Sequence, residues 1–472
     1  MAPLRSDAPA WAGSSAPKPG LTRRNEVSRS PHDTVRGKSC RPGSRQSGSN
    51  RERSLALASP MKIAHLKAAG ALYLGSLVVI YALVLWNARD LIWKGYPDFT
   101  IYYTAGTMIR QGMGHTLYDD AAQFKIQQQF APNVATRLAA LPFNHPPFEA
   151  LIFIPLTYLS YRVAFLLWAL LNVALIFTAM SLIRPYAPLL REWPAALIGL
   201  ASLAFFPIFF ALLQGQDAIL LLFFYALTFV ALKNNSFFSA GAWLACGLFK
   251  FHLVLPFLLL MLVLQKTAQA RRKIFCGFLL VGAVLGLVSL AMVGMQQMIF
   301  YPRYVLGLEA TMARGAIMPS DMPNLRGALY LIASKLPHFD LAVVALSGVV
   351  FALALCKLRS REERTDDLKY SLAIITTVLV SYHGLGYDLC LLVIPIVLVG
   401  GWLKTRMQFV SWSRTAIIAG LALLLFPPLH LVLLMRYNRL GFLGWAVLLF
   451  FAGVCGELGS RSLRPAADLA QD

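Results

Sequence analysis

Charged residues are scarce in this sequence. Asp, Glu, Lys and Arg make up 14% of the 472 residues, whereas a soluble chain of this size carries roughly 25%. Hydrophobic residues make up 57% of the chain, and its mean hydropathy is +0.60. Uncharged runs at 68–86 and 274–294 are long enough to cross about 30 Å of hydrocarbon. The scarcity of charged residues excludes an ordinary soluble protein and, with the long apolar runs, indicates a chain that crosses a membrane repeatedly.

Cysteines and the common nucleotide motifs are also lacking. The six cysteines show neither zinc-finger nor redox spacing, so we expect small buried side chains, with no disulfide and no thiolate metal site. Walker A loops, zinc-protease motifs and a convincing serine nucleophile are absent. We therefore do not expect soluble nucleotide chemistry, and we expect any phosphate substrate to be carried by a lipid.

The positive charge is not arranged for binding nucleic acid. The net charge is +21, and residues 1–60 hold 11 Lys and Arg against 4 Asp and Glu. The remaining excess is spread over short loops, with no basic stripe among exposed aromatics. Residues 1–60 lack an apolar period and the core of a signal peptide, so we expect a disordered basic tail. Met61 opens the basic start of the first span, and we expect it to be the biological start.

Helices are the only spanning structure that the apolar segments allow, because alternating strand patterns are missing. We predict an all-α integral membrane protein with about 12 transmembrane helices in one domain, 61–460, followed by a short cytoplasmic tail, 461–472. The apolar segments are 68–86, 146–160, 163–183, 194–213, 218–232, 237–249, 253–264, 274–294, 341–356, 370–382, 389–403, 415–435 and 440–456.

Lysine and arginine set the predicted orientation. We treat 146–160 as re-entrant and 237–249 and 253–264 as two short crossings. Lys and Arg are then about threefold denser in the inner loops, as the positive-inside rule requires. Both termini are cytoplasmic in this topology. Its large outer loops are 87–162, with interfacial helices, and 295–340.

An alternative topology has 146–160 as a full crossing and 237–264 as one span. It would leave Lys250 in the middle of the membrane, where an isolated lysine is costly. The preferred topology places the unusual polar segments together on the outer side, which predicts one extracytoplasmic site near the membrane surface. These segments are YPDFTIYY (96–103), FNHPPFE (143–149), QGQD (214–217), KFH (250–252), MPSDMPNLRG (318–327) and YHGLGYD (382–388).

The candidate side chains also have structural interpretations. Asp98 has two compatible interpretations, as the N-cap of a helix that begins near Phe99 and as a carboxylate base at the membrane surface. Tyr102 and Tyr103 are either interfacial belt aromatics or rings that stack on a sugar. His145 either orients the turn in FNHPPFE or faces a ligand phosphate or hydroxyl.

Basic residues in apolar surroundings need a counter-charge or water. Lys250 either pairs with a lipid phosphate or reaches the lipid headgroups. His383 and Asp388 either bind phosphate or support Asp98, and Asp388 alternatively caps the helix that follows it. Arg326 is a further partner for phosphate.

Five stretches match a family pattern: DFTIYYTAGTMIRQGMGHTLYD (98–119), NHPPFEALIFIPLTYLSYRVAFLLWALLN (144–172), QGQDAILLL (214–222), AGAWLACGLFKFHLVLP (240–256) and YHGLGYDLCLLVIP (382–395). In these stretches the chain resembles glycosyltransferase family 87, the polyprenyl-phosphate-mannose type of transferase in the GT-C superfamily. The resemblance extends over about 68–457. The FKFH sequence departs from the family's lysine-then-proline pattern.

The resemblance implies a GT-C fold and an inverting transfer of a hexose, often mannose, from a polyprenyl monophosphate to a lipid or glycan acceptor. Asp98 matches the family's aspartate in the first outer loop and would deprotonate the acceptor hydroxyl. Lys250, His383 and Arg326 would stabilise the leaving phosphate, so neither a cofactor nor a metal is expected. The candidate substrate-binding residues are Tyr102, Tyr103, His145, Gln216, Asp217, Tyr387 and Asp388.

We therefore predict a monomeric, multi-pass glycosyltransferase of the inner (plasma) membrane with an extracytoplasmic active site. A transporter or flippase of lipid-linked sugars is the main alternative. It would predict broken or charged helices in matching halves of the chain, and the sequence shows no such repeat. A ligase that uses a lipid diphosphate would favour a metal-binding carboxylate cluster or an arginine-rich loop, and neither is evident in the sequence.

Overall fold

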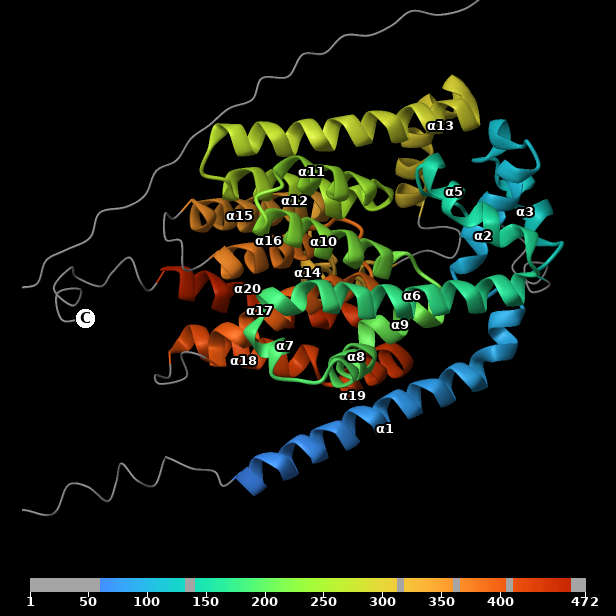
Figure 1. The fold of residues 1–472 in the computed structure, drawn as a ribbon. Helices are drawn as coiled ribbons and strands as arrows, with labels where there is room; N and C mark the ends of the chain where they lie inside the picture. Colours follow the sequence, from blue (N-terminus) through green and yellow to red (C-terminus); the bar gives the residue numbers. More distant parts are fainter. Residues whose placement is uncertain (1–59, 132–140, 312–317, 360–365, 405–410, 460–472) are drawn as a thin grey trace, which may run out of the picture. The chain divides into compact units, whose positions relative to one another are not determined.

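The computed structural model describes residues 60–131, 141–311, 318–359, 366–404 and 411–459 (Figure 1). Every regular element within these residues is a helix, which confirms the predicted all-α class. The contacts divide the chain into two units, Met1–Ile63 and Ala64–Asp472, and the description below concerns the second. The predicted disordered tail lies outside the described residues, apart from Pro60.

A polar side chain caps helix α3 in the first half of the chain. The Asp119 carboxylate accepts hydrogen bonds from the backbone of Ala121 and Ala122 at the start of α3. The helices in this half are α1 (Pro60–Trp93), α2 (Phe99–Arg110), α3 (Asp120–Gln127), α5 (Ala150–Phe153), α6 (Tyr161–Ile183), α7 (Pro188–Arg191), α8 (Ala195–Ala204), α9 (Phe206–Gln214) and α10 (Ala218–Lys233).

Helix α13 in the second half is broken at Gly294, whose φ of 78° is not helical, so it consists of two helical segments. Asn324 caps α14 by accepting from the backbone of Gly327. The helices here are α11 (Phe237–Cys246), α12 (Phe251–Leu264), α13 (Ala268–Thr311), α14 (Leu325–Ala333), α15 (Phe339–Leu358), α16 (Asp366–Val380), α17 (Val393–Lys404), α18 (Trp412–Leu424), α19 (Pro427–Val432) and α20 (Leu443–Gly459).

Fewer helices qualify as membrane spans than the sequence predicts. By length and composition, 6 described helices can cross a membrane, or up to 9 if each bent pair is one span. The predicted count of about 12 is therefore not confirmed. Segment 146–160 forms only short helical pieces ending at Tyr158, below the length of a span.

Three apolar stretches are bent instead of straight. The predicted span 194–213 is divided into α8 and α9 with a bend of 71°, and 415–435 into α18 and α19 with a bend of 58°. Pro207 and Pro427 follow these two bends, where a proline cannot continue the hydrogen bonding of the preceding helix. The third pair, α11 and α12, bends by 65°, and Lys250 lies at this break.

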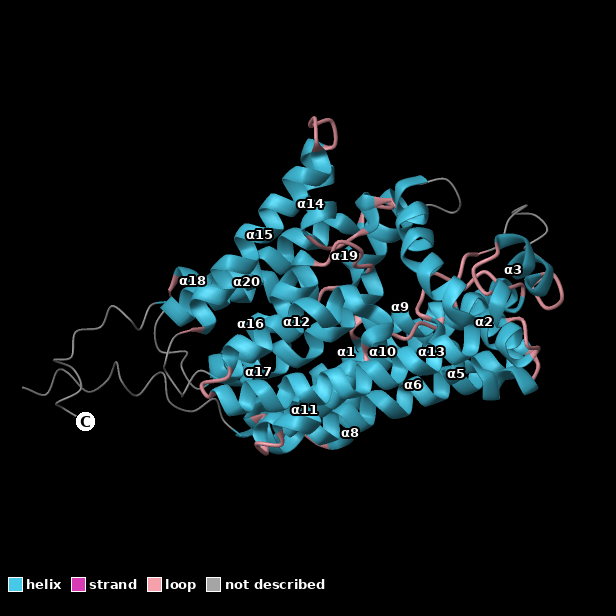
Figure 2. Cartoon of the chain, turned by 90° about the horizontal axis from the view of Figure 1, so that it is seen from above, coloured by secondary structure: helices cyan, strands magenta, loops and turns pink. Residues whose placement is uncertain are grey.

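Close backbone contacts hold neighbouring helices together. A Cβ atom added to Gly241 of α11 would lie 1.9 Å from the Ile274 carbonyl oxygen of α13, and one added to Gly277 would lie 2.1 Å from that of Phe238. Glycine therefore permits the contact between α11 and α13, as small residues commonly do between membrane helices. Figures 1 and 2 show these two helices running side by side.

The segment between α1 and α6, which we call the first loop region (94–160), packs around a hydrophobic cluster that it shares with residues of α1, α6 and α13. Its helices α2, α3 and α5 are grouped together in both views (Figures 1 and 2). Tyr102 is 0% exposed and Tyr103 is 8% exposed. Interfacial belt aromatics would face lipid and water, so that interpretation is wrong for both tyrosines.

Candidate active site

A tight turn brings the QGQD segment to Asp98. Helix α9 ends at Gln214, and Gly215 then adopts a left-handed φ of 62°, which favours glycine. A Cβ atom on Gly215 would lie 2.7 Å from the Cβ of Phe99. The Trp168 indole donates a hydrogen bond to the Gly215 carbonyl at 2.9 Å. The turn therefore packs directly on the residue that follows Asp98.

The rigidity of this turn can be tested by substitution of Gly215. We expect Gly215→Ala to destabilise the protein by about 1–3 kcal/mol, because alanine is strained in the left-handed region and its methyl group would press on Phe99. Gly286→Ala is the matched control, because a Cβ atom there meets nothing within 4 Å. Thermal unfolding of the two purified variants provides the comparison. Equal stability of both would show that the turn relaxes freely.

The Asp98 side chain does not cap α2. It makes no capping hydrogen bond, although the residue directly precedes the helix. Instead, the Gln216 amide donates to Asp98 Oδ2 at 2.6 Å, and the Asp98 backbone N–H donates to the Gln214 side chain at 3.3 Å. Asp98 is half-buried. Of the two interpretations of this residue, the capping one is therefore wrong.

Tyr102 fixes the orientation of Gln216. Its hydroxyl donates to Gln216 Oε1 at 2.8 Å, which leaves the amide nitrogen to face Asp98. The Tyr102 ring stacks on Phe153 with 4.7 Å between centroids. Burial raises the pKa of Tyr102 well above its usual value, and the neighbouring Asp217 carboxylate raises it further. The hydroxyl therefore remains a donor at neutral pH.

Lys250 lies in a buried ion network. Its side chain is 4% exposed, and its Nζ lies 3.0 Å from Asp217 Oδ1 and 3.0 Å from Asp388 Oδ1. The ammonium also lies over the Tyr387 ring, 4.9 Å from its centroid. Asp388 additionally accepts from the backbone of Leu385 at 2.9 Å. The counter-charges of Lys250 in this structure are therefore two carboxylates of the protein.

His145 and Glu149 extend the network on the other side of Asp217. His145 Nδ1 lies 2.7 Å from Glu149 Oε2 and 3.8 Å from Asp217 Oδ2. Burial, opposed by Asp217 and assisted by Lys250, lowers the pKa of His145 to about 4. Burial and then the Asp217 charge raise the pKa of Glu149 well above its usual value. His145 is therefore a neutral imidazole at neutral pH, and burial favours the protonated form of the Glu149 carboxyl.

Asp217 remains charged beside His145 and Glu149. Burial alone would raise its pKa, but Lys250, His145 and two side-chain hydrogen bonds bring the pKa below the ordinary value. The ligand atoms of His145, Glu149 and Asp217 lie within 4.8 Å of one another, a donor set that divalent metals accept. The 2.7 Å contact between His145 and Glu149 has the length of a direct hydrogen bond. The predicted absence of metal dependence stays a prediction.

Of the other predicted residues, His383 lies beside this network. The His383 and His252 rings are 5.9 Å apart, and His383 acts electrostatically on both His145 and His252. Arg326 is 4% exposed, and its guanidinium lies 3.9 Å from the centroid of the Tyr382 ring. The structure therefore places Arg326 next to the segment that carries His383.

The structure brings together most of the predicted site residues. Tyr103 is different, because its hydroxyl donates to the Leu159 carbonyl at 2.7 Å instead of joining the network around Asp98. The predicted set missed Glu149 and Gln214. The spacing of Glu149 four residues after His145, at the start of an apolar segment, was the available signal. The connected residues are Asp98, Tyr102, His145, Glu149, Gln216, Asp217, Lys250, Tyr387 and Asp388.

The described residues form a helical membrane protein in which a half-buried aspartate adjoins a buried network of carboxylates, a lysine and histidines. The sequence model of glycosyltransferase family 87 matches residues 143–381, which is half of the chain. The protein belongs to this family and is a glycosyltransferase. The match contains His145, Gln216 and Lys250, and it begins after Asp98. A search of curated proteins found no match.

Proposed function

We propose that the protein transfers a hexose, mannose in the first instance, from a polyprenyl monophosphate to a lipid or glycan acceptor. The observation that carries this proposal is Asp98, whose carboxylate is half-buried, is not used for capping, and is held by Gln216 and Tyr102. A carboxylate in a fixed position suits general base catalysis. The ion network next to it is buried, and fixed charges of this kind would give the site a preorganised electrostatic environment.

The proposed reaction is a single displacement. Asp98 accepts the proton of the acceptor hydroxyl while that oxygen attacks the anomeric carbon. The bond between this carbon and the phosphate oxygen breaks, and the polyprenyl phosphate leaves with the electron pair. Attack from the face opposite the leaving group inverts the anomeric configuration. Gln216 is a positioning residue in this scheme, because it acts through Asp98.

Phosphate recognition is divided between two groups of residues in the proposal. Lys250 shares its charge with Asp217 and Asp388, so its main contribution is to hold these carboxylates and the adjoining segments in place. Arg326 contributes a second positive charge beside His383, because its guanidinium lies 3.9 Å from the centroid of the Tyr382 ring. His383 completes this side of the site by hydrogen bonding.

The proposed location is the outer face of the inner membrane. The distribution of Lys and Arg supports cytoplasmic termini. Five of the six polar segments that this topology places outside meet in the structure around Asp98 and Lys250. The proposed topology has about 12 crossings. The bent segments 194–213 and 415–435 count as one crossing each, and 237–249 and 253–264 count as two.

A transfer assay tests the proposal. Purified protein in lipid nanodiscs would be incubated with radiolabelled polyprenyl-phosphate mannose and a membrane lipid extract. We expect label in a new product of inverted configuration, no product from a polyprenyl diphosphate sugar, and an initial rate unchanged by EDTA. In proteoliposomes, movement of intact donor across the bilayer without a new product would instead support the transporter alternative.

A further inference from the structure

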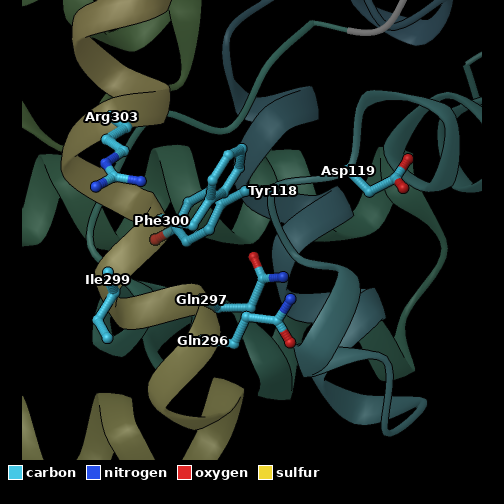
Figure 3. Close-up of a pocket in the computed structure, with 7 residues that line it drawn as sticks. All are labelled: Tyr118, Asp119, Gln296, Gln297, Ile299, Phe300 and Arg303. Carbon is cyan, nitrogen blue, oxygen red and sulfur yellow. The ribbon is translucent and has the colours of Figure 1, made fainter.

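A cleft of about 480 Å³ lies between the first loop region and α13. Figure 3 shows that one helix, α13 beyond Gly294, provides most of its lining, and that the first loop region provides the rest. This volume is within the range of pockets that hold whole small-molecule ligands. The lining residues are Tyr118, Asp119, Gln296, Gln297, Ile299, Phe300 and Arg303.

The chemistry of this lining suits a saccharide. Phe300 is 43% exposed, and an exposed ring can pack against the C–H face of a pyranose. Gln296 and Arg303 are exposed on the same helix, and amide and guanidinium groups donate to hydroxyl oxygens in fixed geometry. Gln297 is held in place by a 2.7 Å hydrogen bond to the His115 carbonyl. A hydrocarbon chain would leave these polar groups without partners.

The cleft is joined to the candidate active site through one layer of side chains. The Tyr118 hydroxyl donates to the His145 carbonyl at 2.8 Å, and the Tyr301 hydroxyl reaches the Asn144 carbonyl at 3.4 Å. The His145 ring in turn lies 5.1 Å from that of Tyr102, which positions Gln216. A ligand in the cleft would therefore lie beside the reacting centre and not in it.

We propose that this cleft binds the oligosaccharide head of the acceptor. This inference rests on the proposed transfer reaction and gives its acceptor a chemical class, a glycan whose sugar rings extend beyond the hydroxyl that reacts. The donor hexose is excluded from the cleft, because its anomeric carbon must lie next to the Asp98 carboxylate. The rings of the acceptor pack on Phe300, and their hydroxyls bond to Gln296 and Arg303.

Direct binding tests the cleft without any transfer step. The probe is mannotriose, added to the full chain in nanodiscs and observed by saturation-transfer NMR. We expect binding by the wild type and about tenfold weaker binding by Phe300→Ala, the loss expected when one stacking ring is removed. Leu306→Ala is the matched control, because Leu306 is 69% exposed on the same helix and does not line the cleft. It should bind as the wild type does.

Kinetics separate this inference from the proposed function. In the transfer assay, Phe300→Ala should raise the acceptor KM about tenfold and leave the donor KM and kcat unchanged. Absence of mannotriose binding by the wild type, or equal binding by Phe300→Ala, would overturn the cleft assignment whatever the transfer assay shows. Absence of transfer with intact, Phe300-dependent binding would overturn the proposed function and support a glycan-binding cleft.

Discussion

Replacement of Asp98 by asparagine should lower kcat by roughly 10²- to 10⁴-fold, the contribution typical of a general base. Asparagine has nearly the same shape and still offers an oxygen to the Gln216 amide, which donates to Asp98 at 2.6 Å. The substitution therefore removes the proton acceptor and preserves the surrounding hydrogen bonds. Steady-state transfer kinetics with a saturating donor measure the loss, and the donor KM should change little because binding is not altered.

Tyr102→Phe is a companion that leaves the base intact. The phenyl ring keeps the stack on Phe153 but no longer donates to Gln216, so the amide is free to turn its oxygen toward Asp98. We expect kcat to fall by about tenfold, less than in Asp98→Asn, because one buried hydrogen bond is worth about 1–1.5 kcal/mol. If the Asp98→Asn variant turned over as fast as the wild type, Asp98 would not be the general base.

The polar segments of the sequence predicted which parts of the chain contribute to the candidate site. Charged and amide side chains are costly in apolar helices unless they meet one another, so the few that occur, such as Asp217 and Lys250, indicate positions that converge. The structure confirms this convergence with the 3.0 Å ion pair between them. From the sequence, Asp388 was expected to bind phosphate, support Asp98 or cap a helix, and the structure adds its 3.0 Å contact with Lys250.

The sequence could not show which partner each group takes. Lys250 was expected to meet a lipid phosphate, but its pairing with Asp217 and Asp388, which are distant in the sequence, depends on helix packing that no local pattern encodes. Tyr103 lies next to Tyr102 on α2, yet the two hydroxyls reach different partners, Gln216 and the Leu159 carbonyl. Successive residues of a helix point about 100° apart, so only the tertiary contacts decide their roles.

The positions at which apolar segments bend could not be predicted from the sequence. Hydropathy over 194–213 is continuous, because both halves, α8 and α9, are apolar. A proline within such a segment either kinks a helix or ends it, and the packing of neighbouring helices determines the outcome. The bend at this position carries α9 to Gly215 and so delivers Gln216 to Asp98. A span count from hydropathy alone therefore misses the feature that builds the site.

The second large effect is expected on stability, from Lys250→Met. Methionine fills a similar volume but leaves Asp217 and Asp388, which are 0% and 2% exposed, without their shared cation. Removal of one partner from a buried ion pair typically costs about 3–5 kcal/mol. Titration with SDS in mixed micelles unfolds the protein and measures the change in its free energy of unfolding. Lys404→Met is the control, because Lys404 pairs with Glu192 where both side chains are 52% exposed, and such pairs contribute about 0–1 kcal/mol.

A combined variant identifies the cause of the destabilisation. If uncompensated carboxylates are responsible, Lys250→Met together with Asp217→Asn and Asp388→Asn should recover part of the lost stability, because the buried charges are then removed along with their partner. If lost packing around the lysine stem were responsible, the combined variant would be no more stable than Lys250→Met alone. A Lys250→Met effect as small as that of Lys404→Met would mean that water reaches the network. The site would then lack the dry, fixed environment on which the proposed electrostatic stabilisation of the leaving phosphate depends.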